Sequence, residues 1–347
     1  MLRNLGYIGL VYGIITLLSC RQESSNMDEP ELSSSKDEIR TRHLHSVKEV
    51  NQMLEKSSSI VIIEVNKRKE FRRGHLKGAI NIWRPDYETK LSSKFGGMRA
   101  TKEEMEQLLG SIGILPSDTL LIYDSKGNVD ALRLLWILEL YGHDHLMIMN
   151  GGKALWEQSS YPLSTDENER KATNYQFQEA ENNNLVATLK DVKNAINDKR
   201  VQVVDTREPV EYLGKPFIVN GEVFKWKNGA FDYGTIPTAL HFNWSEATDL
   251  NNDHRFKSMK DIKYNFEKAG IDPKGEIIVF CQSGARSSHT AYVLREIFGN
   301  DKVRNYDGSW IEWSYEHLQN NVEVNQLTDK EQFFEIYEEL SKNIDKN

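Results

Sequence analysis

Short apolar runs alternate with amphipathic segments along the chain, and the alternation occurs twice in the same order. In the first half the pattern predicts strands at 59–65, 119–123 and 147–149 and helices at 102–109 and 128–141. In the second half it predicts strands at 201–204, 276–280 and 303–306 and helices at 258–269 and 286–298. Strands that alternate with helices favour the α/β class, in which a mostly parallel sheet carries helices on both faces.

The two halves also match in register, which indicates a duplicated domain. Five pairs of positions are each separated by 157 residues: Asp124 and Cys281, Gly127 and Gly284, Asn150 and Asp307, Gly151 and Gly308, Trp156 and Trp313. Further upstream the separation is 141 residues for Glu64 and Asp205 but 160 residues for Gly74 and Gly234. The difference places an insertion of 19 residues in the second half, within 213–233.

A length of 347 residues suits two domains, and the duplication suggests where they begin and end. We expect one domain at 39–163, a polar linker at 164–186, a second domain at 187–325 and a charged helix at 326–347. The chain has 44 Lys and Arg residues against 52 Asp and Glu, a net charge of −8. Because this charge repels a polyanion, no nucleic-acid partner is expected.

The N-terminal segment is typical of an exported lipoprotein. It has one cation, Arg3, and then an apolar run of about 14 residues, which is shorter than the roughly 20 that a membrane-spanning helix needs. The run ends in Leu-Leu-Ser before Cys20, which resembles a bacterial lipobox. We expect a signal peptide at 1–19, lipid on Cys20, a flexible tether at 20–38, and folded domains that lie outside the cytoplasm at the cell envelope, bound to the membrane through the lipid only. In the alternative, Cys20 is an incidental residue of an ordinary signal peptide.

The second cysteine, Cys281, stands where chemistry is expected. Two cysteines so far apart are too few for a disulfide framework or a multi-cysteine zinc site. Cys281 follows the predicted strand 276–280 and precedes a predicted helix, so backbone N–H groups and the positive end of the helix dipole point toward its sulfur. The predicted loop that surrounds the sulfur consists of Gln282, Ser283, Gly284, Ala285, Arg286 and Ser287. Such a loop lowers the pKa of a thiol and holds an anionic group attached to it.

Cys281 has two other interpretations. A cysteine at the end of a strand often only fills space, but here polar residues and an arginine follow it. Cysteine-based phosphatases have five residues between the cysteine and the arginine, whereas only four separate Cys281 from Arg286. The shorter loop suits one additional sulfur atom better than a phosphoryl group.

The loop from Cys281 to Ser287 resembles the active-site loop of rhodanese-family sulfurtransferases. Other segments resemble further motifs of that family: 205–207 and 234–239 near the start of its catalytic domain, 306–313 near its end, and 70–79 and 150–152 as degenerate copies in the first half. The resemblance implies two rhodanese-like domains, of which only the second is active. Asp124 replaces the cysteine in the first domain, and Val129 stands where Arg286 has its counterpart.

The resemblance also implies a mechanism. The Cys281 thiolate takes the outer sulfur of a small anionic donor such as thiosulfate, and a thiol or cyanide acceptor then removes it. No metal or organic cofactor is needed. Arg207 is expected either to line the site or to brace the loop, and Trp310 to line it. Glu211 stands where mammalian-type members have a substrate-binding arginine, which favours thiosulfate over mercaptopyruvate. A 3-mercaptopyruvate sulfurtransferase and a non-enzymatic persulfide carrier stay open as alternatives, with a phosphatase or arsenate reductase as a third.

Overall fold

The computed structural model describes residues 39–56, 59–90, 95–215, 217–219, 222–224 and 229–321. The predicted signal peptide, the tether, Cys20 and the predicted helix at 326–347 all lie outside these residues. No helix in the described part of the chain is both long and apolar enough to cross a membrane.

The first half folds around a five-stranded sheet whose paired strands are all parallel, in the order β1-β5-β4-β2-β3. Its strands are β1 (Leu44–His45), β2 (Ile60–Val65), β3 (Ile80–Ile82), β4 (Thr119–Tyr123) and β5 (Leu146–Met149). Its helices are α1 (Val47–Lys56), α2 (Arg68–Phe71), α3 (Arg84–Tyr87), α4 (Lys102–Ser111), α5 (Val129–Tyr141) and α6 (Gly152–Gln158). Helix α4 begins at a capping box in which Thr101 accepts from the N–H of Glu104 and Glu104 accepts from that of Thr101.

The second half repeats this topology with a parallel sheet in the order β10-β7-β11-β12-β6. Its strands are β6 (Val186–Ala187), β7 (Val201–Asp205), β10 (Leu240–His241), β11 (Glu276–Phe280) and β12 (Val303–Tyr306). Its helices are η1 (Asn183–Leu185), α7 (Leu189–Ala195), α8 (Pro209–Tyr212), η2 (Trp244–Ala247), α9 (Met259–Lys268), α10 (Ala285–Tyr292), the π-helical turn η3 (Val293–Ile297) and α11 (Ser309–Asn321). Each strand has its equivalent in the first sheet, with β4 matching β11 at the centre.

The insertion contains an element that the apolar pattern did not predict. Two short strands, β8 (Phe217–Val219) and β9 (Glu222–Phe224), pair antiparallel as a separate ribbon. The helix predicted at 286–298 is also modified, because α10 ends at Tyr292 and the chain continues as η3. The remaining predicted strands and helices are present, with ends that differ by a few residues.

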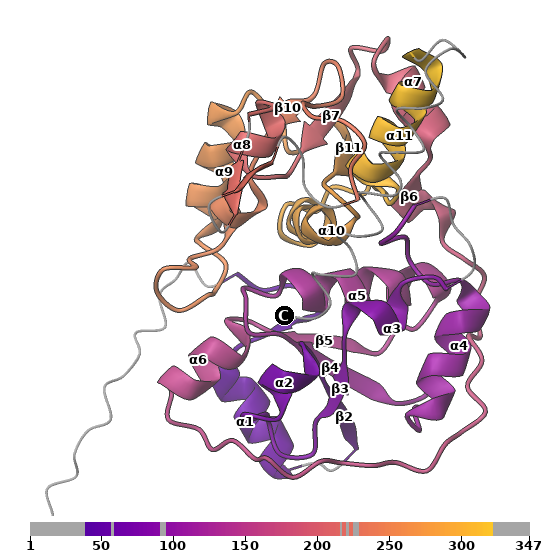
Figure 1. The fold of residues 1–347 in the computed structure, drawn as a ribbon. Coiled ribbons are helices and arrows are strands. Elements are labelled where there is room, and N and C mark those ends of the chain that lie inside the picture. The colour runs from indigo at the N-terminus through magenta and orange to yellow at the C-terminus, as the bar shows by residue number, and fades with distance from the viewer. Residues whose placement is uncertain are drawn as a thin grey trace, which may run out of the picture. The chain divides into compact units, whose positions relative to one another are not determined.

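Helices α5 and α10 lie between the two sheets and pack against each other (Figure 1). The apolar core around them is continuous and takes side chains from both halves, among them Leu132 and Leu135 of α5 and Ala291 and Leu294 after the start of α10. Separate apolar clusters cover the outer faces of the two sheets. Both faces of each sheet are therefore buried, as the apolar strands predict, and the protein has the expected α/β class.

Candidate active site

The chain turns sharply between β11 and α10, and Cys281 is the first residue of this turn. The apolar strand β11 is buried along nearly its whole length and ends at Phe280. Gly284 then takes a left-handed backbone conformation with φ of +89° and caps α10, which begins at Ala285. A residue with a Cβ adopts this conformation at a cost, so the glycine permits the tight strand-to-helix connection that the sequence predicts.

Burial and hydrogen bonding act on the Cys281 thiol in opposite directions. Its side chain is 2% exposed, and burial raises the pKa of the thiol. The charge of Arg286, the hydroxyl and N–H of Ser287 and the N–H of Ser283 lower it. The net result is a pKa below the usual value of 9.0. The site therefore favours a thiolate although it is almost closed to solvent.

A second segment, 309–311, holds the backbone on both sides of the sulfur. The N–H of Cys281 donates to the Ser309 hydroxyl at 3.1 Å, and its carbonyl accepts from the N–H of Trp310 at 2.9 Å. The carbonyl of Gln282 accepts from the N–H of Ile311 at 3.2 Å. With these peptide groups fixed, the direction of the Cys281 side chain is defined by the fold rather than by a mobile loop.

Arg286 is not free in the site, because Glu211 binds it. Nη1 of Arg286 lies 2.6 Å from Oε2 of Glu211 and Nη2 lies 3.0 Å from Oε1, with the two side chains 14% and 3% exposed. Burial alone lowers the pKa of Arg286, but Glu211, Cys281 and Asp205 together hold it above its usual value. The sequence predicted both residues near the site but not that they pair.

Arg207 and Trp310 form a brace beside this loop. The guanidinium of Arg207 binds both carboxylate oxygens of Asp205, donates to the carbonyl of Gly234 at 2.6 Å, and lies 4.5 Å from the centre of the Trp310 ring. Its side chain is 2% exposed. Of the two roles considered for Arg207, these contacts fit the bracing one. The Trp310 indole N–H donates to the carbonyl of Asp232, and the ring is also buried.

In the first domain, the counterpart of Cys281 is Asp124, and its carboxylate occupies a ring of backbone amides. The four donors are Lys126 (2.7 Å) and Asn128 (2.8 Å), both to Oδ1, and Asp130 (2.8 Å) and Ala131 (3.2 Å), both to Oδ2. Two of these amides, those of Lys126 and Asp130, correspond by the 157-residue register to the Ser283 and Ser287 amides at the Cys281 sulfur. Burial, and then the charge of Asp130, raise the pKa of Asp124 to about 6 although the amides lower it, so the carboxylate is ionised above that pH. Corresponding amides of the two duplicated loops therefore face the Asp124 carboxylate and the Cys281 sulfur.

Arginines of the first domain reach the second domain next to this loop, which periodicity did not predict. Nη2 of Arg133, on α5, lies 2.5 Å from Oδ1 of Asp307, and Nη1 of Arg99 lies 3.0 Å from Oδ2. Arg133 and Asp307 are each 2% exposed. One sequence signal could have identified Arg133, because an arginine within an apolar helix requires a buried counter-charge.

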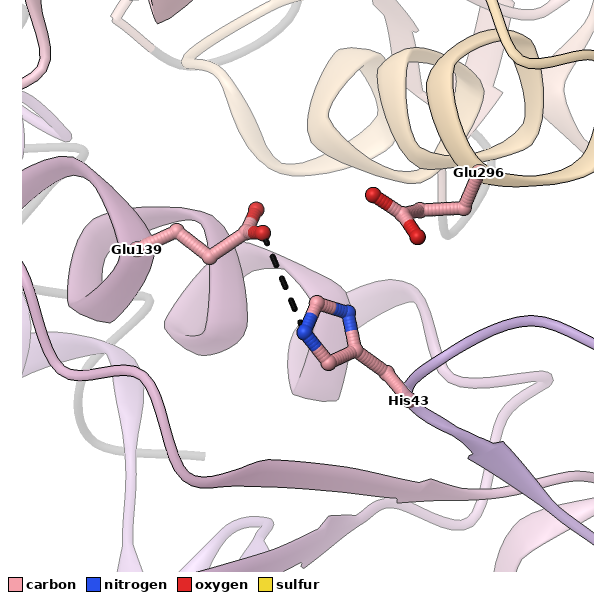
Figure 2. Close-up of side chains that lie close together, drawn as sticks. All are labelled: His43, Glu139 and Glu296. Carbon is pink, nitrogen blue, oxygen red and sulfur yellow. Dashed lines mark ion pairs between the residues drawn. The ribbon is translucent and has the colours of Figure 1, made fainter.

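A second charged cluster joins the domains elsewhere (Figure 2). Figure 2 shows His43, Glu139 and Glu296, whose ligand-type atoms lie within 4.8 Å of one another. Arg42 contacts both glutamates, at 2.5 Å and 3.3 Å, and Arg295 contacts Glu139 at 3.1 Å. Burial, and then Arg42, lower the pKa of His43 to about 4, so the ring is neutral at pH 7. Because two arginines already balance the two carboxylates, the arrangement is that of an interdomain ion-pair cluster.

Comparison with known proteins agrees with the duplication. A family model described as a rhodanese-like domain matches residues 46–159 and 188–316. The chain is 34% identical over 259 residues to a presumed thiosulfate sulfurtransferase of Saccharopolyspora erythraea, covering 74% of this chain and 88% of the relative. It is 36% identical over 259 residues to one of Mycobacterium leprae, covering 74% of this chain and 89% of the relative.

Among solved structures, the anaerobic ergothioneine biosynthesis enzyme of Chlorobium limicola has a similar fold, with a TM-score of 0.66 and 22% identity. The match covers 79% of this chain and 68% of the other. The chain therefore belongs to the rhodanese-like domain family, and it is a sulfurtransferase with two such domains in tandem.

Proposed function

We propose that the protein transfers the outer sulfur of thiosulfate to a thiol or cyanide acceptor through a persulfide on Cys281. The Cys281 thiolate attacks the outer sulfur, the S–S bond of thiosulfate breaks, and sulfite leaves with the bonding electron pair. The enzyme then carries Cys–S–S⁻. Cyanide attacks the outer sulfur of this group, thiocyanate leaves, and the thiolate is restored, so charge and atoms balance in both half-reactions.

The carboxylate of Asp124 is the observation that carries this proposal. An aspartate Oδ is the third atom beyond Cα, and the outer sulfur of a cysteine persulfide is also the third. Asp124 therefore places its negative atoms where an equivalent persulfide would place its own, and four amides bind them at 2.7–3.2 Å. The amides of Ser283 and Ser287, which correspond to two of these four, lower the pKa of the Cys281 thiol. The first domain thus supports a persulfide-binding role for the second, because preorganised donors stabilise an anion without rearrangement.

We favour thiosulfate as the donor because of the charges around Arg286. Glu211 occupies both guanidinium Nη groups of Arg286. A donor that depends on a carboxylate clamp, as mercaptopyruvate does, has to compete with Glu211 for Arg286. Thiosulfate has no carboxylate, so it needs Arg286 only for charge attraction, and its transferred sulfur binds at the thiolate and the amides of the loop.

We also propose that lipid on Cys20 holds the enzyme at the cell envelope. The lipobox-like residues before Cys20 support this proposal. Cell fractionation of the full chain and of the Cys20→Ser variant tests it. The full chain is expected in the membrane fraction and the variant outside it, and equal distribution of the two contradicts the proposal.

Mass spectrometry of the full chain carrying Cys20→Ser, in which Cys281 is the single thiol, tests the proposed chemistry. We expect one sulfur atom added to Cys281 after incubation with thiosulfate, little after mercaptopyruvate, and removal of that sulfur by cyanide with release of thiocyanate. The matched control is the same chain with Cys281→Ser, which gains nothing. An unmodified Cys281 after incubation with thiosulfate overturns the proposal. Loading without turnover identifies a persulfide carrier instead, and hydrolysis of an aryl phosphate identifies a phosphatase.

A further inference from the structure

The first domain lacks the reactive cysteine, yet it presents its arginines to the segment that fixes Cys281. Arg133 is inside the apolar helix α5 and contacts Asp307 across the domain boundary at 2.5 Å. Arg99 contacts the same carboxylate through its side chain at 3.0 Å and through its backbone N–H at 3.2 Å. Burial raises the pKa of Asp307, but Arg133 and Arg99 outweigh burial and hold that pKa below its usual value. Asp307 is therefore a buried anion that depends on cations of the other domain.

Asp307 leads directly into the residues that hold the reactive cysteine. It follows strand β12, and the next residues supply the Ser309 hydroxyl and the Trp310 N–H, which bind the two peptide groups of Cys281. The Ser309 hydroxyl in turn donates to the carbonyl of Tyr306 at 2.8 Å. A displacement of Asp307 would therefore change the orientation of the Cys281 backbone.

The arginines also contact the loop directly. A Cβ built on Gly284 would lie 2.4 Å from Nη1 of Arg133 and 2.9 Å from Oδ1 of Asp307, so the ion pair packs against the backbone that caps α10. A Cβ on Gly97, two residues before Arg99, would lie 2.7 Å from Cβ of Ser283. The N–H of Ser283 is one of the groups that lower the pKa of the Cys281 thiol.

The equivalent place in the other loop has no such ion pair. By the 157-residue register, Asn150 corresponds to Asp307, and Thr290 corresponds to Arg133. Asn150 accepts one hydrogen bond, from the N–H of Phe256 at 3.1 Å. Although the two domains are related by duplication, the arginine–aspartate pair at this place is found at the loop that contains the cysteine and not at its equivalent position in the first domain.

We propose that Arg133 of the first domain is a positioning residue, which through Asp307 and Gly284 holds the sulfur-binding loop of the second domain in its active conformation. The proposal rests on the proposed function only for its activity measurements. It assigns a role to the inactive domain, which completes the support of an active site that it does not itself contain. Arg133 touches no reacting atom, so its effect is transmitted through the loop.

The experiment compares Arg133→Met and Arg133→Lys with a matched interdomain control, Arg295→Met. Arg295 also binds a carboxylate of α5 across the domain boundary, Glu139 at 3.1 Å, and it lies on η3, outside the loop 281–287. The first measurement is the rate of Cys281 alkylation by iodoacetamide against pH, in the full chain with Cys20→Ser. The second is kcat and KM with thiosulfate, each calculated per folded molecule from the thermal unfolding curve.

We expect Arg133→Met to raise the midpoint pH of alkylation by about half a pH unit or more, because displaced amides stabilise the thiolate less. We expect kcat to fall about 10- to 100-fold, because small misplacements of a reacting group are costly, with a smaller change in KM. Arg133→Lys keeps the charge but loses the planar guanidinium with its several donors, so we expect a midpoint pH and a kcat between those of the wild type and Arg133→Met. Arg295→Met should leave both measurements at the wild-type values.

The proposal is overturned if both Arg133 variants have the alkylation profile and the kcat of the wild type. The proposal is also overturned if Arg295→Met changes the alkylation midpoint and kcat as much as Arg133→Met does. Such a result indicates that the loss of any interdomain contact has the same effect on Cys281. If Arg133→Met does not fold, Arg133→Lys and Asp307→Asn carry the same measurements. Alkylation needs no sulfur donor, so a shifted profile supports positioning even if thiosulfate proves not to be the substrate.

Discussion

Arg286 and Glu211 form a bidentate ion pair beside the Cys281 sulfur. Nη1 of the arginine lies 2.6 Å from Oε2 of the glutamate, and Nη2 lies 3.0 Å from Oε1. The arginine lowers the pKa of Cys281, while the glutamate partly offsets the arginine's charge. The pair therefore determines how strongly the site attracts an anionic donor. Either partner can be changed separately, which leads to two predictions.

Removal of the Glu211 charge should strengthen donor binding. In Glu211→Gln, Arg286 keeps one hydrogen-bond acceptor but its positive charge is no longer balanced. We expect KM for thiosulfate to fall about 3- to 10-fold, which is of the order of one pKa unit of interaction or less, and to become more dependent on salt. The control is Glu208→Gln. Glu208 precedes α8 and has the same charge as Glu211, but its side chain binds Asn243 instead of Arg286. An unchanged KM in Glu211→Gln contradicts the prediction.

Removal of the Arg286 charge should raise the pKa of the Cys281 thiol. Arg286 is the largest of the influences that lower the pKa of Cys281, and burial is the influence that raises it. In Arg286→Met, burial prevails, so the pH at which alkylation reaches half its maximal rate should rise by at least about one pH unit. Arg286→Lys, which keeps a cation, should shift this pH less. A midpoint that stays at the wild-type pH in Arg286→Met means that the amides alone lower the pKa.

The register of the duplication made much of the site predictable. Cys281 and Asp124 do follow equivalent central strands, and Gly284 and Gly127 both have positive φ, as matched turn glycines should. A loop of this kind is local, and strand, turn and helix signals within a short stretch define it. The apolar pattern does not predict the β8–β9 ribbon, because the paired stretches are only three residues each, too short to show periodicity.

Pairings between distant charges could not be predicted in this way. Glu211 and Arg286 are 75 residues apart, and Arg133 and Asp307 belong to different domains. Periodicity indicates which face of an element is buried, but it carries no information about which buried charge meets which. The sequence leaves the role of Arg207 open for the same reason, since a side chain that braces a loop and one that lines a site have the same sequence context.

The buried pair of Asp205 and Arg207 should contribute strongly to stability, and the chain contains a matched exposed pair. Arg207 is 2% exposed, whereas Arg200 binds Asp198 with the same two-residue spacing and is 88% exposed. Arg207→Met leaves Asp205 as a buried unpaired charge and should lower the free energy of unfolding by about 3–5 kcal/mol. Arg200→Met should have no measurable effect, because solvent screens that pair. Urea unfolding measures both, and equal effects contradict the explanation.

The likeness between Asp124 and a persulfide can be tested by transferring the aspartate to the second loop. If the amides of 283–288 form the same ring as those around Asp124, Cys281→Asp should fold with its carboxylate in the place of the outer sulfur, and it should be inactive. Cys281→Asn has the same shape, but its NH₂ group meets backbone N–H donors, so two donors lose their acceptor. We expect Cys281→Asp to be more stable than Cys281→Asn by about 2 kcal/mol at pH 8, where the carboxylate is ionised. Thermal and urea unfolding measure the difference. If Cys281→Asn proves as stable as Cys281→Asp, the second loop has no preference for an anion, and the central argument for persulfide binding fails.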